Sequence, residues 1–277
     1  MVTPDAGRLF VVSTPIGNMG DFSFRAVEVL KSVQLVLAED TRHSRPLLDR
    51  YGITAPMAPY HEHNEAKTTP RIVERLIAGE DIALISDAGT PLVSDPGQRL
   101  VTAAIEAGIV VIPLPGASAL LAALVASGLP ADRFTFFGFL PRKGKERTAL
   151  LEEIASSRCT AVMYEAPGRV ADSLRELADR AGDRTAVVAR ELTKKFEELR
   201  RGTLESLSAY YKEAPPRGEV VILVAGAPLA APDENALHDE ARTLRARGLS
   251  VRDVAAELAK RGAPRNLAYR IARGTDA

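Results

Sequence analysis

Four times in the first half of the chain, a short apolar run ends in a polar loop that contains glycine or proline, and a helix-like segment follows. The apolar runs cover residues 9–13, 33–38, 82–85 and 110–114. Repeated alternation of strand, loop and helix predicts a largely parallel sheet covered by helices. Because open α/β sheets bind ligands at the carboxyl ends of their strands, the loops after these runs are the places to search for a site.

The third of these loops is the one around which we interpret the chain. Residues 83–97 read ALISDAGTPLVSDPG, and the polar part is long for a connection inside a compact domain. Asp87 and Asp95 bring charge to backbone that Gly89 and Gly97 allow to approach a ligand closely. Two interpretations stay open, a ligand-binding loop and a capped turn into the next helix, and Asp95 is assigned only to the turn.

Two further loops carry weaker signals. The turn at residues 14–21 contains Gly17 and Gly20 but lacks the three-glycine dinucleotide fingerprint and any P-loop. Residues 115–118 place Ser118 at the start of a small apolar helix, a position that favours an anion or a carboxylate. Simple capping by Ser118 explains the same pattern.

In the second half of the chain, strands are predicted at residues 134–140, 160–164, 185–189 and 220–225. The first of them is followed by residues 141–147, in which four cations surround a glycine. Contact with phosphate and a solvated hairpin are both compatible with this basic loop.

The tail is predicted to be helical after a linker-like segment at residues 227–233. Ser250 begins one helix as a cap, with Asp253 in the capping-box position, and Gly262 ends that helix before a second one from Pro264. The two basic helices resemble a helix-turn-helix. Nucleic-acid contact and a role in packing or dimerisation both remain open.

The overall charge excludes a global basic field, because Lys plus Arg and Asp plus Glu both total 36. Any nucleic-acid contact must therefore use local patches. A single cysteine, Cys159, suits a reducing cytoplasm, no apolar run approaches the ~20 residues that span a membrane, and the N-terminus lacks the pattern of a signal peptide. His61 and His63 share one face of an extended segment, but without further ligands nearby we expect no metal site there.

Taken together, the motifs of this chain resemble those of the bacterial ribosomal small-subunit RNA methyltransferase I family. The resemblance extends from about residue 9 to about residue 224 and rests on eight segments in the expected order. These are STPIGNMGD, AEDTRHS, ALISDAGTPLVSDPG, VIPLPGASALLAAL, FFGFLPRKGKER, YEAPGRV, ARELTKKFEE and RGEVVILV. Any one of them is weak evidence alone, whereas eight in order are highly specific.

The resemblance implies the tetrapyrrole-methylase-like α/β fold, in which two α/β domains flank a cleft for S-adenosylmethionine. On this chain the domains should be residues 1–118 and 119–226, followed by a small helical tail at residues 235–277. The implied reaction is methylation of the ribose 2′-hydroxyl of a cytidine in the decoding region of 16S rRNA, free or within the small ribosomal subunit. The resemblance further implies a cytoplasmic enzyme without a metal or a membrane, commonly a homodimer.

The resemblance also assigns a cofactor pocket, which draws on the strand-end loops of both domains. The residues carried over are Pro15, Gly17, Asp87, Ala88, Gly89, Thr90, Val93, Ser94, Ser118, Ala119, Met163, Tyr164, Arg190, Gly218 and Glu219.

The catalytic residues must be inferred from chemistry, since a ribose hydroxyl is a poor nucleophile at neutral pH. We expect Asp40 or Glu39 to take the proton, and Arg42 with Lys194 to position a phosphate or an oxyanion. In the alternative interpretation the carboxylates only orient the arginine.

Two other functions fit the same motifs less well. One is a methylase of a tetrapyrrole or another small substrate on the same fold. The other is a non-catalytic RNA-binding assembly factor that keeps an old cofactor pocket. The AEDTRHS and ELTKKFEE segments and the basic tail favour RNA.

Overall fold

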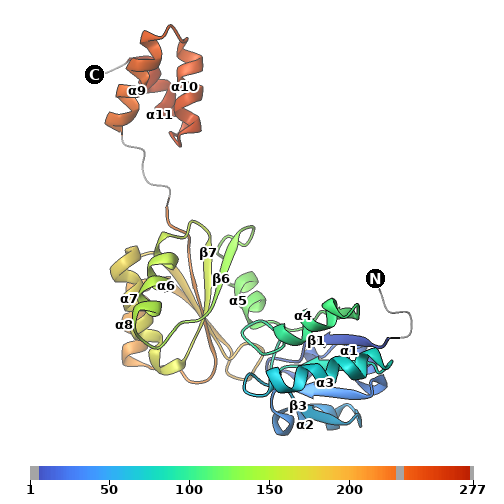
Figure 1. Cartoon of the computed structure of the whole chain (residues 1–277). Helices are drawn as coiled ribbons and strands as arrows, with labels where there is room; N and C mark the ends of the chain where they lie inside the picture. The colour runs from blue at the N-terminus through green and yellow to red at the C-terminus, as the bar shows by residue number, and fades with distance from the viewer. Residues whose placement is uncertain (1–5, 229–233, 275–277) are drawn as a thin grey trace. The chain divides into compact units, whose positions relative to one another are not determined.

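The computed structural model describes residues 6–228 and 234–274 of the chain (Figure 1). Residues 1–226 and 227–277 form two separate compact units. The first unit contains two sheets of five strands each within the described residues, and the second unit is helical there.

The first sheet is entirely parallel, with the strand order β3-β2-β4-β1-β5. The strands are β1 (Arg8–Val12), β2 (Leu35–Ala38), β3 (Met57–Pro59), β4 (Ile82–Ile85) and β5 (Val110–Leu114). Every residue of β2 and β4 is buried, as expected for strands that are covered on both faces. The predicted parallel sheet is confirmed, although the short edge strand β3 was not predicted because three residues ending in proline carry too little pattern.

Helices cover both faces of this sheet. They are α1 (Phe24–Ser32), α2 (Thr41–Arg50), α3 (Glu65–Ile77) and α4 (Gln98–Glu106). One core cluster joins the sheet to Leu30 and Leu48, and another joins it to Leu76 and Leu100. The helix predicted at residues 47–51 begins earlier, at Thr41, because the segment after β2 has its own cap.

The second sheet is mixed, with the strand order β6-β7-β10-β8-β9. The strands are β6 (Phe134–Phe139), β7 (Thr160–Glu165), β8 (Thr185–Arg190), β9 (Glu198–Thr203) and β10 (Val220–Val224). Strands β6 and β7 are parallel, whereas β10 lies antiparallel between β7 and β8, and β9 is antiparallel to β8. The sequence did not predict β9, whose polar residues ELRRGT form an edge strand that pairs with β8 alone.

The two faces of the second sheet are covered differently (Figure 1). The helices are α5 (Ala119–Ser127), α6 (Lys145–Ser156), α7 (Val170–Ala181) and α8 (Leu204–Glu213). Helices α6, α7 and α8 pack on one face around Met163 and Ile222. Helix α5 packs on the other face around Val162 and Val221, together with Ile16 from the turn after β1. Ile16 therefore connects the two halves of this unit through their cores.

The second unit is a small bundle of α9 (Glu234–Ala246), α10 (Val251–Lys260) and α11 (Arg265–Ala272). Its own core includes Leu237, Leu258 and Ile271. The Ser250 cap is confirmed, since its Oγ accepts the Asp253 N–H at 3.2 Å. The predicted linker lies partly outside the described residues. Among the helices of the described residues, none is long and apolar enough to cross a bilayer.

Candidate functional site

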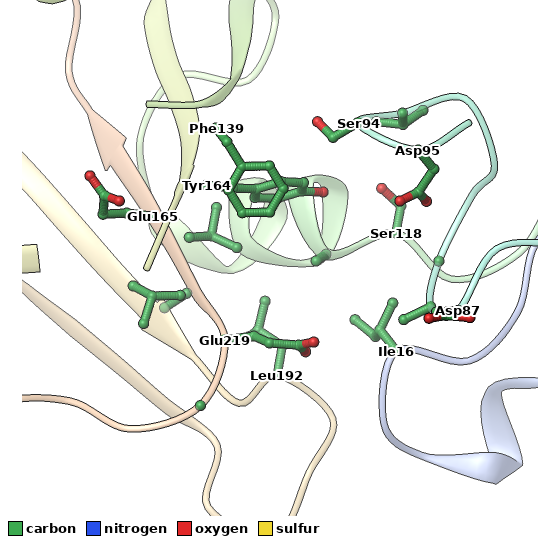
Figure 2. A pocket seen from close by; sticks show the side chains of 18 of the residues that line it. Ile16, Asp87, Ser94, Asp95, Ser118, Phe139, Tyr164, Glu165, Leu192 and Glu219 are labelled. Atoms are coloured by element: carbon green, nitrogen blue, oxygen red, sulfur yellow. The ribbon is translucent and has the colours of Figure 1, made fainter. Parts of the chain in front are cut away.

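A cavity of about 470 Å³ lies where strand-end loops of the two sheets meet (Figure 2). Its volume falls in the range of about 300–1,000 Å³ that is usual for small-molecule sites. The wall residues are Ile16, Glu39, Asp87, Ala88, Gly89, Thr90, Val93, Ser94, Asp95, Ser118, Ala119, Phe139, Tyr164, Glu165, Ala166, Pro167, Ala189, Leu192, Gly218, Glu219, Val220 and Val221.

The loop between β4 and α4 forms the central part of this wall. Gly89 and Thr14 exchange two backbone hydrogen bonds, of 2.8 and 3.0 Å, which tie the loop to the turn after β1. Thr90 Oγ1 contacts Ser13 Oγ at 3.0 Å and donates to the carbonyl oxygen of Ala117 at 3.2 Å. Thr90 thus joins three strand-end loops in addition to lining the cavity.

The same loop holds strained backbone. Leu92 and Ser94 have positive φ values of 73° and 68°, which side-chain-bearing residues rarely adopt. Such strain persists only where surrounding contacts enforce it, and it concentrates at ligand sites. The conformation favours the ligand-binding interpretation of the loop over the capped turn.

The carboxylates of Glu39, Asp87 and Asp95 line the side of the cavity that the loops of the first sheet form. Burial, and then the charges of Glu39 and Asp87, raise the pKa of Asp95 to about 6, against a hydrogen bond from Ser86. Burial also raises the pKa of Glu39, followed by the charge of Asp87. In the described residues none of the three forms an ion pair, so this wall carries negative charge that a cationic ligand would compensate.

Apolar and aromatic side chains line the side of the second domain. Figure 2 shows the rings of Phe139 and Tyr164 facing Ser94 and Asp95 across the cavity. The two rings meet edge to face with centroids 5.2 Å apart. Burial raises the pKa of Tyr164, which keeps its hydroxyl neutral. A planar heterocycle is the kind of group that such a surface accepts.

Lys194 does not point freely into the cavity. Its Nζ donates to Glu191 Oε1 and Glu219 Oε2, both at 2.9 Å. Its aliphatic stem packs against Gly17 so closely that a Cβ there would lie 2.3 Å from Lys194 Cγ. Gly17 is therefore needed for the close contact between the turn after β1 and the Lys194 side chain, and it does not line the cavity.

Asp40 and Arg42 form a unit of their own beside the cavity. The Asp40 carboxylate caps α2 by accepting the Arg42 N–H at 2.8 Å and pairs with the Arg42 guanidinium at 2.9 Å. Hydrogen bonds from Arg42 lower the pKa of Asp40 to about 2. The Arg42 side chain is 89% exposed. This geometry agrees with the interpretation that the carboxylate orients the arginine.

Most residues of the predicted cofactor set meet in the cavity wall. Those that line it are Asp87, Ala88, Gly89, Thr90, Val93, Ser94, Ser118, Ala119, Tyr164, Gly218 and Glu219. Pro15, Gly17, Met163 and Arg190 do not. The Met163 side chain lies in the core on the other face of the sheet, and Arg190 pairs with Glu198 at 2.7 Å. That the wall residues bind a cofactor stays a prediction.

Several wall residues were not among the predicted set, including Asp95, Ile16, Phe139 and Leu192. Asp95 had a usable signal, a second carboxylate in a glycine-rich strand-end loop. The apolar wall residues had no such signal, because apolar residues of a cavity wall are indistinguishable in sequence from residues of the hydrophobic core. The ring centroids of His61 and His63 lie 6.0 Å apart, and no group of three or more His, Cys, Asp or Glu side chains in the described residues is placed to hold a metal ion.

Comparison with known proteins gives one consistent family. The sequence pattern of the family described as Tetrapyrrole (Corrin/Porphyrin) Methylases matches residues 8–208. A protein of Synechocystis sp. named Ribosomal RNA small subunit methyltransferase I is 48% identical over 270 residues, which cover 96% of this chain and 97% of that protein. A protein of Xylella fastidiosa with the same name is 53% identical, with coverage of 82% and 84%.

Solved structures with low sequence identity share the fold. Diphthine synthase aligns with a TM-score of 0.62 at 16% identity, covering 79% of this chain and 90% of its own. Uroporphyrin-III-C-methyltransferase from Thermus thermophilus aligns with a TM-score of 0.55 at 21% identity, covering 79% and 94%.

Proposed function

The chain belongs to the ribosomal RNA small subunit methyltransferase I family of the tetrapyrrole methylases, and we propose that it methylates the ribose 2′-hydroxyl of a cytidine in the decoding region of 16S rRNA. The observation in the site that carries the proposal is a cavity with two different walls. Carboxylates without ion-pair partners line one wall, and aromatic rings line the other. Such a cavity suits a cationic, nucleoside-like molecule.

The residues of the cavity fit S-adenosylmethionine as the methyl donor. When bound, it supplies an electrophilic methyl group on a positively charged sulfur. Glu39, Asp87 and Asp95 offer compensation for positive charge, and Phe139 and Tyr164 offer an apolar surface for an aromatic ring. The strand-end backbone around Ala88, Gly89 and Ser118 is open to polar contacts because small side chains cover it.

The proton of the ribose hydroxyl needs an acceptor in the cavity. Of the two residues predicted from the sequence, Glu39 lines the wall and Asp40 does not. Asp95 joins Glu39 as a candidate, because a pKa of about 6 suits a base that works near neutral pH. We assign Asp40 to capping α2 and orienting Arg42, and Arg42 to an RNA phosphate at the mouth of the cavity. Lys194 holds the domain contact.

A transfer assay tests the proposal most directly. Labelled S-adenosylmethionine is incubated with the protein and either naked 16S rRNA or intact small subunits, and mass spectrometry locates the methyl group. We expect 2′-O-methylcytidine in the decoding region. Methylation of a tetrapyrrole instead would support the small-substrate alternative. Cofactor binding by calorimetry without transfer to RNA or subunits would support the assembly-factor alternative.

We further propose that the enzyme works in the cytoplasm as a homodimer. Leu121 and Val125 support the dimer, because these apolar residues of α5 are 49% and 77% exposed. Light scattering on Val125→Lys tests it, with a shift from dimer to monomer expected. A wild-type monomer at working concentration would contradict it.

A further inference from the structure

A second cavity of about 590 Å³ adjoins the first, with Phe139 and Ala166 lining both. The remaining lining residues are Leu140, Pro141 and Arg142, which follow β6, and Arg169, which immediately precedes α7. The proposed methyl transfer does not involve this cavity. None of the cofactor-binding residues carried over from the family motifs lines it.

Buried ion pairs fix the frame of the second cavity. The Glu165 carboxylate is fully buried and contacts the guanidinium groups of Arg169 and Arg147, the latter at 3.7 Å. Each arginine also holds the backbone after β6, because Arg169 Nη2 donates to Leu140 O at 3.0 Å and Arg147 Nη1 donates to Pro141 O at 2.9 Å. These hydrogen bonds therefore fix the backbone at the point where β6 ends and the basic loop begins.

Arg142 brings an uncompensated positive charge to this cavity, whereas Arg169 is paired with Glu165. Arg142 is exposed and forms no ion pair or side-chain hydrogen bond within the described residues, and the same holds for the adjacent Lys143 and Lys145. Arg169 Nη1 is buried without a hydrogen-bond partner. Helix α7 begins at this place, and no side chain caps its amino end. The free guanidinium of Arg142 and the unsatisfied Nη1 of Arg169, near the amino end of a helix, favour a phosphate.

An aromatic ring stands between the two cavities. Phe139 is 59% exposed although it packs edge to face on Tyr164, so one face of the ring is open to solvent. Exposed aromatic rings beside cations are the common means by which proteins stack the bases of unpaired RNA. Phosphate and base are the two parts of a nucleotide, and both recognition elements occur within four residues, from Phe139 to Arg142.

We infer that the second cavity is a nucleotide subsite for single-stranded RNA: Arg142 and Arg169 bind a backbone phosphate, and the adjoining base stacks on Phe139. This inference rests on the proposed function for its substrate class and adds the place where the strand enters the site. A strand held there lies directly beside the cavity that binds the methyl donor.

RNA affinity at several salt concentrations tests the subsite. The probe is a short single-stranded RNA oligonucleotide, measured by fluorescence anisotropy with Arg142→Ala and Phe139→Leu. Arg142→Ala should weaken binding several-fold and reduce the slope of log K against log salt by about 0.7, the value for one phosphate on a single strand. Phe139→Leu should weaken binding about tenfold through lost stacking and leave the salt slope unchanged.

Arg158 provides a matched control, because it is exposed and lies before the amino end of β7, whereas Glu165 and the cavities lie at the carboxyl end. Arg158→Ala should keep the wild-type RNA affinity and salt slope. Equal slopes for Arg142→Ala and the wild type would overturn the subsite. Calorimetry with S-adenosylmethionine is run in parallel, and loss of that binding in Arg142→Ala would place its effect in the first cavity and also overturn the subsite.

The subsite and the proposed function can fail separately. A wild-type protein that transfers no methyl group but binds the oligonucleotide through Arg142 and Phe139 would reject the proposed function and support the subsite. A wild-type protein that methylates 16S rRNA while both variants bind RNA normally would support the function and overturn the subsite.

Discussion

The two sides of the first cavity differ in how their charges are balanced. On the side of the first sheet, Glu39, Asp87 and Asp95 have no ion-pair partner in the described residues. On the side of the second sheet, Glu165 and Glu219 are each paired with cations. Acidic residues are thus present on both sides, but only the carboxylates of the first side are free of ion pairs and available to a cationic ligand.

This contrast separates residues that act on a ligand from residues that build the site. Unpaired carboxylates raise one another's pKa, which is costly unless a cation binds. Paired ones hold backbone in place, as Glu165 does for the end of β6 through two arginines. The following variants test the contrast, from the largest expected effect to the smallest.

Removing the proton acceptor should have the largest effect. If Glu39 or Asp95 takes the ribose proton, Glu39→Gln or Asp95→Asn should lower kcat by about 10²–10⁴-fold. If Asp95 is the base, the activity of the wild type should rise as pH increases through about 6, where Asp95 ionises, and this rise should be absent in Asp95→Asn. Steady-state kinetics at saturating cofactor across pH measures both.

Asp40→Asn provides the comparison for that experiment, because asparagine also caps helices well. Its kcat should fall far less than that of the cavity variants. A large loss in Asp40→Asn, with Glu39→Gln and Asp95→Asn fully active, would reverse the assignment.

Breaking the paired side should damage the fold itself. Glu165→Ala leaves Arg147 and Arg169 without their shared buried carboxylate, so the free energy of unfolding should fall by about 3–5 kcal/mol. Glu176→Ala is the control, since that side chain contacts Arg147 but is 37% exposed. Urea unfolding distinguishes them, and equal small losses would show that the buried pairs contribute little.

A side chain at Gly17 should disturb the domain contact. Gly17→Ala places a Cβ 2.3 Å from Lys194 Cγ at a backbone φ of 154°, which should cost about 1–3 kcal/mol. Gly52→Ala meets nothing within 4 Å at a φ of 63°, so it isolates the backbone cost alone. If both variants lost the same stability in thermal unfolding, the contact with Lys194 would not matter.

Removing one of the carboxylates that lack an ion-pair partner should stabilise the protein slightly. The pKa of Asp95 rises from 3.8 to about 6 on folding, so between these values the folded chain binds more protons and stability falls as pH rises. Asp95→Asn removes this loss and should raise stability at pH 8 by about 1 kcal/mol after solvent screening, or about 2–4 °C in Tm. Calorimetry without cofactor should show the gain shrinking toward pH 4. A constant gain would exclude titration of Asp95 as its cause.

The sequence predicted the parts of the fold that follow from apolar periodicity. The buried runs LVLA and IALI gave β2 and β4 and, with their loops, the edge where the cavity lies. Strand β9 was not predicted, because its charged side chains lack an apolar pattern and form ion pairs along the edge of the sheet. An example is the ion pair of Glu198 with Arg200 at 2.8 Å. A polar edge strand and a charged loop have similar amino-acid compositions, so the sequence alone does not distinguish them.

The site was predictable to the level of loops and not to the level of side-chain direction. Met163 and Tyr164 are neighbours on β7, yet one lies in the core under α6 to α8 and the other lines the cavity, because successive side chains on a strand face opposite ways. Which face carries the site depends on where α5 packs, and that is a property of the folded sheet. The raised pKa of Asp95 likewise depends on Glu39, which is distant in the sequence.

The antiparallel strand β10 has a consequence for how the molecule is made. It fills the gap between β7 and β8, and it is synthesised after both. At a translation rate of about 5–20 residues per second, the 34 residues that follow Arg190, up to Val224, take roughly 2–7 s to be synthesised, and during this time β7 and β8 lack their shared neighbour. Gly218 and Glu219, just before β10, are wall residues. All strands of the first sheet are synthesised before β6, but the cavity can close only when β10 has inserted between β7 and β8.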